Sequence, residues 1–125
     1  MTAQVLVVED NEKNMKLFRD VLAATGFRTL EATTGEQAVA LASEHAPDLV
    51  LMDIQLPDFD GIEALGRLRS DERTASLPVL ALTAQAMEGD RERFLEAGFD
   101  GYLSKPVNVA DFVATVKRYC EKGDR

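Results

Sequence analysis

Five polar residues whose side chains suit phosphate chemistry each follow a short apolar stretch of the chain. Glu9 and Asp10 follow the first stretch, Asp53 and Thr83 follow two later ones, and Lys105 follows the last. Three carboxylates held together repel one another, and a hard divalent cation relieves that repulsion, which makes Mg²⁺ the candidate metal. An ammonium group and a hydroxyl suit the oxygens of an incoming phosphate. The set indicates phosphoryl transfer to a carboxylate, and Asp53 is the best candidate nucleophile.

These residues can act together only if the fold brings the ends of the apolar stretches to one edge. Each stretch is too short for a helix and is typical of a buried strand, and each is followed by a segment with helical spacing. The pattern predicts five β/α units. The expected strands lie near residues 4–8, 27–32, 49–52, 79–82 and 101–104, and the expected helices begin near residues 11, 34, 62, 85 and 109.

Capping and turn residues mark the ends of the expected helices. Gly26 and Pro47 are typical stop signals, and the spacing from Thr34 to Gln37 predicts a capping box. Asn108 is expected to cap the last helix. One apolar face is expected on that helix, made of Val109, Phe112, Val113, Val116 and Cys120.

Regular alternation of strands and helices predicts an α/β fold with a parallel sheet covered on both faces, a three-layer sandwich. Three strands are nearly all apolar and are expected to be central, whereas the second and fifth contain polar residues such as Arg28, Glu31 and Ser104 and are expected at the edges. The flavodoxin-like strand order 2-1-3-4-5 satisfies this. Ligands then bind where the order reverses, between the first and third strands, which end at Glu9 and Asp53.

Composition narrows the function further. A chain of 125 residues, 46% hydrophobic and 29% charged, fits one domain, expected over residues 1–121 with a short tail at 122–125. The net charge of −8 argues against direct nucleic-acid binding. No apolar run reaches the roughly 20 residues of a membrane span, and no secretory signal precedes the first strand, so a cytoplasmic protein is expected. Cys120, the single cysteine, is read as a small apolar residue.

Five separated motifs stand at expected strand ends or in the turns after them. They are Val7-Val8-Glu9-Asp10-Asn11, Leu51-Met52-Asp53-Ile54-Gln55-Leu56-Pro57, Gly61, Ala81-Leu82-Thr83-Ala84 and Ser104-Lys105-Pro106. Each motif alone is weak, but the full set in this order is specific. Over nearly its whole length the chain resembles the receiver domain of bacterial response regulators, a CheY-like domain. Within that family the strings look like those of a single-domain cell-division regulator, and receivers of hybrid histidine kinases share them.

The resemblance implies a role for each matching residue. Asp53 would accept a phosphoryl group from the phosphohistidine of a histidine kinase or phosphotransfer protein. Glu9 and Asp10 would hold Mg²⁺ together with Asp53 and the main-chain carbonyl of Gln55, and Lys105 would contact the phosphoryl group. Glu9 departs from the commonest pattern, which has aspartate there, and its longer side chain is expected to reach the metal through water. The chain would then be a signalling phosphoacceptor that assists its own phosphorylation and dephosphorylation, not a turnover enzyme.

Readout of the signal is implied at Thr83 and Tyr102. Thr83 would move to hydrogen-bond the phosphoryl group, and Tyr102 would rotate inward. This would change the surface of the expected fourth helix, fifth strand and fifth helix, where a downstream protein would bind; the chain is expected to be a monomer or weak dimer. Gln55 and Gln85 match positions that tune the lifetime of the aspartyl phosphate. The family usually has a cis peptide before the proline that matches Pro106.

Other functions are weighed on the same residues. A receiver excised from a hybrid kinase remains open, although Met1 just before the first strand and the end of the chain after the last helix favour a single-domain protein. A haloacid-dehalogenase-type phosphatase would need a second aspartate two positions after Asp53, where the chain has Gln55. A flavin-binding domain would need a Ser/Thr/Gly-rich phosphate loop after the first strand, where the acidic pair Glu9-Asp10 would repel the flavin phosphate.

Several of these residues also have purely structural interpretations. Taken singly, Asp10, Asp53 and Asp60 are typical helix caps, and Tyr102 is typical of an edge strand. His45 is expected to be a solvated residue at a helix end, away from the site. Only the combination of the carboxylates with a lysine and a threonine at strand ends favours phosphate chemistry.

Overall fold

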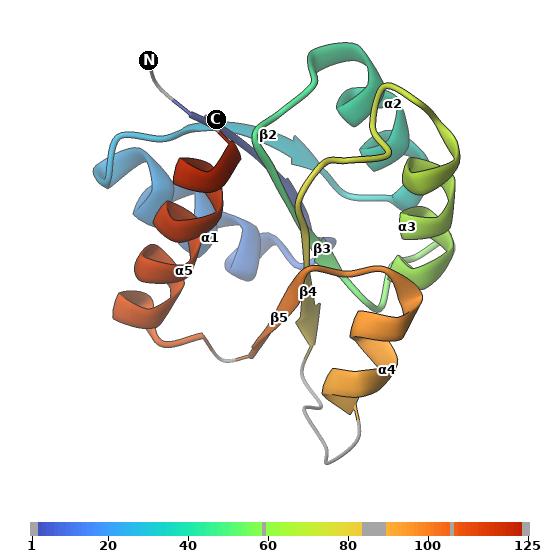
Figure 1. The fold of residues 1–125 in the computed structure, drawn as a ribbon. Coiled ribbons are helices and arrows are strands. Elements are labelled where there is room, and N and C mark those ends of the chain that lie inside the picture. Colours follow the sequence, from blue (N-terminus) through green and yellow to red (C-terminus); the bar gives the residue numbers. More distant parts are fainter. Residues whose placement is uncertain (1–2, 59, 84–89, 106, 124–125) are drawn as a thin grey trace.

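The computed structural model describes residues 3–58, 60–83, 90–105 and 107–123. Strands and helices alternate along the chain as the sequence predicts (Figure 1). The elements are β1 (Gln4–Val8), α1 (Glu12–Ala24), β2 (Arg28–Ala32), α2 (Gly35–His45), β3 (Leu49–Asp53), α3 (Gly61–Ser70), β4 (Val79–Thr83), α4 (Asp90–Ala97), β5 (Gly101–Ser104) and α5 (Val109–Gly123).

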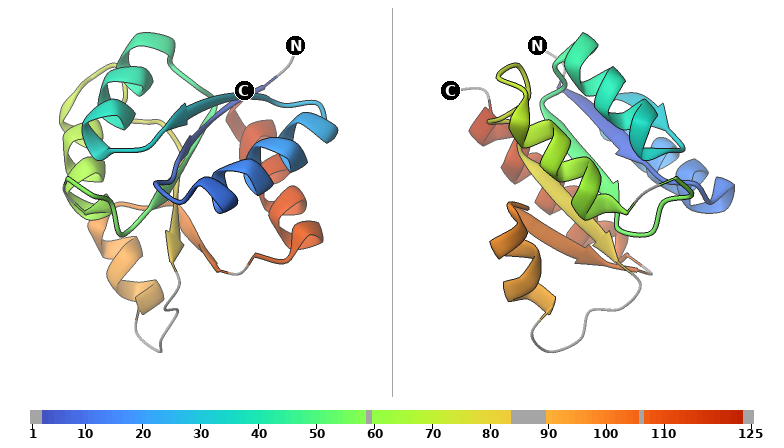
Figure 2. Two further views of the ribbon diagram at one scale, coloured as in Figure 1. Left: turned by 180° about the vertical axis from the view of Figure 1, so that it is seen from behind. Right: turned by 90° about the vertical axis from the view of Figure 1, so that its right-hand side faces the viewer.

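The strands form one parallel sheet in the order β2-β1-β3-β4-β5. Helices α1 and α5 cover one face of the sheet, and α2, α3 and α4 cover the other (Figures 1 and 2). This confirms the three-layer α/β sandwich with the flavodoxin-like order, including the two edge strands. Because β1 pairs with both β2 and β3, the order of the strands reverses between β1 and β3.

Alternation along the central strands divides the interior into two cores. In β1, Val5 and Val7 pack toward α1 and α5, whereas Leu6 and Val8 pack toward the three helices on the other face. Each of these side chains is fully buried, which is worth about 1.5–3 kcal/mol per residue. The nearly continuous apolar runs of the sequence therefore reflect burial on both faces.

Most of the predicted helix ends are confirmed. Asn11 caps α1, and Gly26 follows it with a φ of 91°, a backbone conformation that suits glycine. The side chain of Thr34 accepts the N–H of Gln37 at 3.1 Å, as a capping box requires. The return bond differs from the prediction, because Gln37 accepts the N–H of Thr33 at 2.8 Å and not that of Thr34.

The last helix follows the prediction except at its first residue. Asn108 caps it, and Phe112, Val116 and Cys120 are buried. The expectation that Val109 shares this buried face is wrong, because Val109 is 48% exposed. Helical side chains lean toward the N-terminus, so that of the first residue extends past the end of the packed layer. The helix ends at Gly123, two residues beyond the expected domain boundary at residue 121.

A hydrogen-bonded junction fixes the amino end of β5. Arg69 of α3 donates to the carbonyls of Leu77 and Gly98, at 2.6 and 2.9 Å, and to the carboxylate of Asp100 at 3.1 Å. The hydroxyl of Tyr119 on α5 donates to the carbonyl of Asp100 at 3.0 Å. These bonds tie the residue just before β5 to α3 and α5, and β5 in turn leads to Lys105.

The start of the fourth helix near Gln85 and the peptide bond before Pro106 fall outside the described residues. Within the described part, that helix runs from Asp90 to Ala97. None of the helices described is long and apolar enough to cross a membrane.

Candidate functional site

Two neighbouring strands place three carboxylates at the carboxyl edge of the sheet. Val8 of β1 pairs with Met52 of β3, so the residues that follow them, Glu9 and Asp53, lie side by side. One carboxylate oxygen from each of Glu9, Asp10 and Asp53 lies within 4.8 Å of the other two. Glu9 is fully buried and Asp53 is 6% exposed, whereas Asp10 faces solvent. The structure thus brings together the acidic residues that the sequence singled out.

Lys105 brings a positive charge to these carboxylates from the far side of β4. Its Nζ donates to Glu9 at 2.8 Å (Oε1) and 3.2 Å (Oε2), and to Oδ2 of Asp53 at 2.9 Å. Its main-chain N–H donates to the carbonyl of Thr83 at 2.7 Å, which anchors the residue just after β5. One ammonium group therefore partly neutralises two buried carboxylates.

The electrostatics of the site follow from this crowding. Burial, together with the neighbouring Asp53, raises the pKa of Glu9 from 4.5 to about 7, although Lys105 acts in the opposite direction. Burial also disfavours the charged form of Lys105, but its hydrogen bonds to Glu9 and Asp53 outweigh burial and raise its pKa above 10.5. The site therefore keeps Lys105 protonated. Its single positive charge does not balance the negative charges of the three carboxylates, so a further cation would be favoured there.

The donor set fits a magnesium ion. The three carboxylates lie close together at an edge that is open to solvent at Asp10, and hard cations such as Mg²⁺ prefer oxygen ligands of this kind while keeping several waters. Gln55 is also exposed, two residues after Asp53. Ligation by its main-chain carbonyl stays a prediction.

A close backbone approach holds Asp53 in place. Its Oδ1 accepts the N–H of Gln55 at 2.9 Å, and the N–H of Gly61 donates to the carbonyl of Ile54 at 2.8 Å. A Cβ atom on Gly61 would lie 2.6 Å from the carbonyl oxygen of Asp53, closer than real Cβ atoms come. Gly61 was part of the sequence motif, but the reason for glycine at this position is visible only in three dimensions.

The two predicted switch residues lie on β4, which neighbours the strand that carries Asp53, and on β5, the next strand along. Thr83 ends β4, is 6% exposed, and pairs in register with Ser104 of β5. Tyr102 of β5 is half-buried, and its ring lies 6.1 Å from the ring of Phe94 on α4. The structure places both as expected, while their movements stay a prediction. Gln85, the further candidate for tuning the phosphoryl lifetime, lies outside the described residues.

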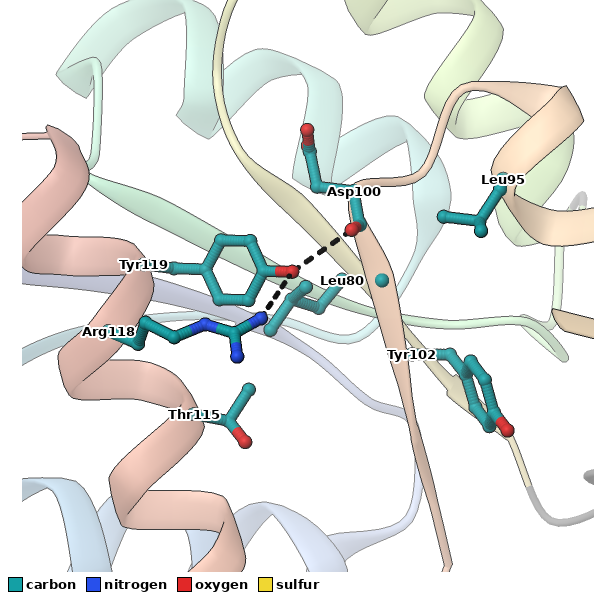
Figure 3. A pocket seen from close by; sticks show the side chains of 8 residues that line it. Leu80, Leu95, Asp100, Tyr102, Thr115, Arg118 and Tyr119 are labelled. Atoms are coloured by element: carbon teal, nitrogen blue, oxygen red, sulfur yellow. Dashed lines mark hydrogen bonds between the residues drawn. The ribbon is translucent and has the colours of Figure 1, made fainter.

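A pocket of about 340 Å³ lies where α4, β5 and α5 meet, the region expected to bind a downstream protein. Arg118 and Tyr119 of α5 line it on one side of β5, and Tyr102 lies on the other side (Figure 3). The guanidinium of Arg118 lies over the ring of Tyr119, with its Cζ 5.1 Å from the ring centroid. The expected output face is therefore hollowed, with a tyrosine on each side of the strand.

Other candidates have structural roles. Asp60 caps α3 by accepting the N–H of Glu63 at 2.8 Å, Cys120 is buried, and the side chain of His45 at the end of α2 is 41% exposed. Sequence reasoning missed Asp58. Its carboxylate accepts hydrogen bonds from two main-chain N–H groups at the start of α2, more than 20 residues earlier in the sequence. No local sequence pattern signals such a contact.

Residues 5–117 match the response regulator receiver domain family. The chain belongs to that family. The polar-differentiation response regulator DivK of Brucella ovis is 50% identical to this receiver domain over 119 residues, which are 95% of this chain and 97% of DivK. DivK of Brucella anthropi is 49% identical over the same share of both chains.

Solved structures agree with this assignment. The receiver domain of the sensor histidine kinase PA1611 from Pseudomonas aeruginosa, which has a magnesium ion coordinated in its active-site cleft, matches with a TM-score of 0.89 and 36% identity over 97% of this chain and 99% of that one. The chemotaxis protein CheY4 of Vibrio cholerae matches with a TM-score of 0.89 and 25% identity over 95% of this chain and 99% of that one. The family match favours a response regulator over the phosphatase and flavin-binding alternatives.

Proposed function

We propose that this receiver domain is a phosphorylation-controlled switch of a two-component or phosphorelay system, and that Asp53 accepts the phosphoryl group from the phosphohistidine of a histidine kinase or a phosphotransfer protein. The observation that carries the proposal is the setting of Asp53. Its two carboxylate oxygens accept from Lys105 Nζ and the Gln55 N–H, at 2.9 Å each, beside two further carboxylates. An oriented carboxylate next to a cation is suited to attack a phosphorus atom.

In the proposed step, a carboxylate oxygen of Asp53 forms a bond to phosphorus while the bond from phosphorus to the donor's imidazole nitrogen breaks. The electron pair of that bond stays on the imidazole, and Asp53 becomes an acyl phosphate. Lys105 is placed to stabilise the negative charge of the transferred group. Mg²⁺, held by Asp10, Asp53, the longer Glu9 and the carbonyl of Gln55, would offset the repulsion between the anionic reactants.

Readout by protein binding completes the proposal. Thr83 would hydrogen-bond the phosphoryl group, and Tyr102 would respond by changing its packing on α4, which alters the surface around α4, β5 and α5. The domain acts as a switch that a partner protein phosphorylates. Its downstream target is a protein and not a nucleic acid, in keeping with the net charge of −8. We further propose a cytoplasmic monomer or weak dimer.

The similarity to DivK extends over 95% of this chain and supports a role like that of a polar-differentiation response regulator. A second candidate is a receiver that works as part of a hybrid kinase, which the 36% identity to the PA1611 receiver favours. Phosphotransfer assays with the histidine kinases of the source organism would separate the two.

The phosphoacceptor is tested with acetyl phosphate as a small phosphodonor. We expect the mass of the wild type to increase by one phosphoryl group only with Mg²⁺ present, and we expect no increase for Asp53→Asn. Asp60→Asn is the matched control, because asparagine also caps a helix, and among the described residues the side chain of Asp60 makes its hydrogen bond to α3 alone. Persistent labelling of Asp53→Asn would show that another residue is the acceptor.

A further inference from the structure

The segment that follows the phosphoacceptor is tied to a helix from a different part of the chain. Asp58 lies five residues after Asp53, and its side chain reaches the first turn of α2. Its Oδ1 accepts the N–H of Gly35 at 2.8 Å, and its Oδ2 accepts the N–H of Glu36 at 3.0 Å. Figure 2 shows the loop after β3 passing close to the start of α2. Two bonds to successive N–H groups fix both the position and the orientation of this carboxylate.

For α2, Asp58 completes the cap that the local sequence leaves unfinished. The first N–H groups of a helix have no partner within the helix, and Gly35 is buried, so its N–H needs a protein acceptor. The side chain of Thr34 accepts the N–H of Gln37, and its carbonyl accepts that of Ala38, so within the described residues Thr34 does not serve the N–H groups of Gly35 and Glu36. A carboxylate at this end also interacts favourably with the helix dipole. The contact thus supplies acceptors for two N–H groups at the start of α2.

Helix α2 is packed in the core, so it can hold the loop that follows Asp53 in place. Ala38 and Ala42 of this helix are fully buried in the core beneath it. The loop itself is packed against the same core through Ile54 and Leu56. The stretch from residue 54 to residue 58 is therefore held at β3 on one side and at α2 on the other, with Gln55 between the two attachments.

We propose that Asp58 is a positioning residue for phosphorylation: by clamping the loop to α2, it fixes the main chain of Gln55, both the N–H that Asp53 accepts and the carbonyl expected to face Mg²⁺. The inference rests on the proposed function of Asp53. It also makes α2 part of the support of the phosphorylation site.

The test compares Asp58→Ala with Thr34→Ala, which removes a capping bond from the same helix; the described residues of the loop make no hydrogen bond to the Thr34 side chain. Loss of a residue that orients metal ligands typically costs 10- to 100-fold in affinity, so we expect Asp58→Ala to weaken Mg²⁺ binding about 10-fold in calorimetry and to slow labelling by acetyl phosphate similarly. Asp58→Asn keeps one acceptor oxygen and should fall between Asp58→Ala and the wild type. Thr34→Ala should bind Mg²⁺ and become labelled as the wild type does.

Amide hydrogen exchange in the metal-free protein tests the clamp apart from the function. We expect the Gln55 amide to exchange about 10-fold faster in Asp58→Ala than in Thr34→Ala. Equal exchange in the two variants, or equal Mg²⁺ affinity, would overturn the positioning role. Failure of the wild type itself to bind Mg²⁺ or become labelled would instead contradict the proposed function, and the exchange rates would still decide whether Asp58 orders the loop.

Discussion

A methyl group added at Gly61 tests how closely the backbone must approach Asp53. In Gly61→Ala the new Cβ would lie 2.6 Å from the Asp53 carbonyl oxygen and 3.0 Å from the Cα of Ile54. Ordinary contacts begin near 3.4 Å, so the backbone must move by about 0.8 Å. The φ of Gly61 is not among the positive values, so alanine is allowed there and the clash alone sets the cost.

The matched control is Gly66→Ala in the same helix. Gly66 is exposed, and nothing lies within 4 Å of an added Cβ. We expect this variant to be up to about 1 kcal/mol more stable than the wild type, because alanine has the higher helix propensity. Overpacking typically costs about 1–3 kcal/mol, so Gly61→Ala should be less stable than the wild type by about that amount. Urea denaturation measures both values.

Function should respond to the same displacement. Moving a reacting group by about 1 Å costs on the order of 100-fold in rate, so we expect labelling of Gly61→Ala by acetyl phosphate to be about 10- to 100-fold slower than that of Gly66→Ala. The comparison is made at saturating Mg²⁺ and below the unfolding transition. A Gly61→Ala protein that is as stable and as readily labelled as Gly66→Ala would refute the steric argument.

Two further predictions concern charge at the site. Without Mg²⁺, the pKa of Glu9 is about 7 in the folded chain and near 4.5 in the unfolded one, so its stabilising contribution is complete below pH 4.5 and is lost as the pH rises through 7. We expect the wild type to lose up to about 3 kcal/mol more than Glu9→Gln between pH 4.5 and 8 in urea unfolding, and parallel pH profiles would contradict this. Lys105→Met leaves Glu9 and Asp53 without their ammonium partner, so it should be less stable by about 3 kcal/mol without metal. Mg²⁺ should stabilise it more than the wild type in thermal unfolding, and equal gains would show that the carboxylates need no second cation.

Most of this fold can be predicted from the periodicity and composition of the sequence. Helices cover both faces of the sheet, so the central strands are continuous apolar runs that are easily recognised. Strands such as β1 are apolar at every central position, and the polar residues of β2 show that it is an edge strand. Once the order is known, the ends of β1 and β3 must meet, which is why Glu9 and Asp53 could be paired from the sequence alone.

Details that depend on contacts between distant segments could not be predicted in this way. The Asp58 carboxylate binds two N–H groups that lie 22 and 23 residues away, and Gly61 is constrained by a carbonyl on a different element. Val109 has helical spacing with Phe112, but spacing does not show where a packed layer ends. Local pattern decides which elements form, whereas close approaches between elements are visible only once they are packed.

The ion pair of Lys105 also bears on how the chain folds. Its partners are 96 and 52 residues away in the sequence, so it forms only when β5 has docked at the far edge of the sheet. A partly folded chain in which β1 and β3 have paired without β5 would hold Glu9 and Asp53 together with their charges uncompensated. Such an intermediate is disfavoured. The charge arrangement of the site thus links the first and last strands, and makes folding of the whole sheet more nearly all-or-none.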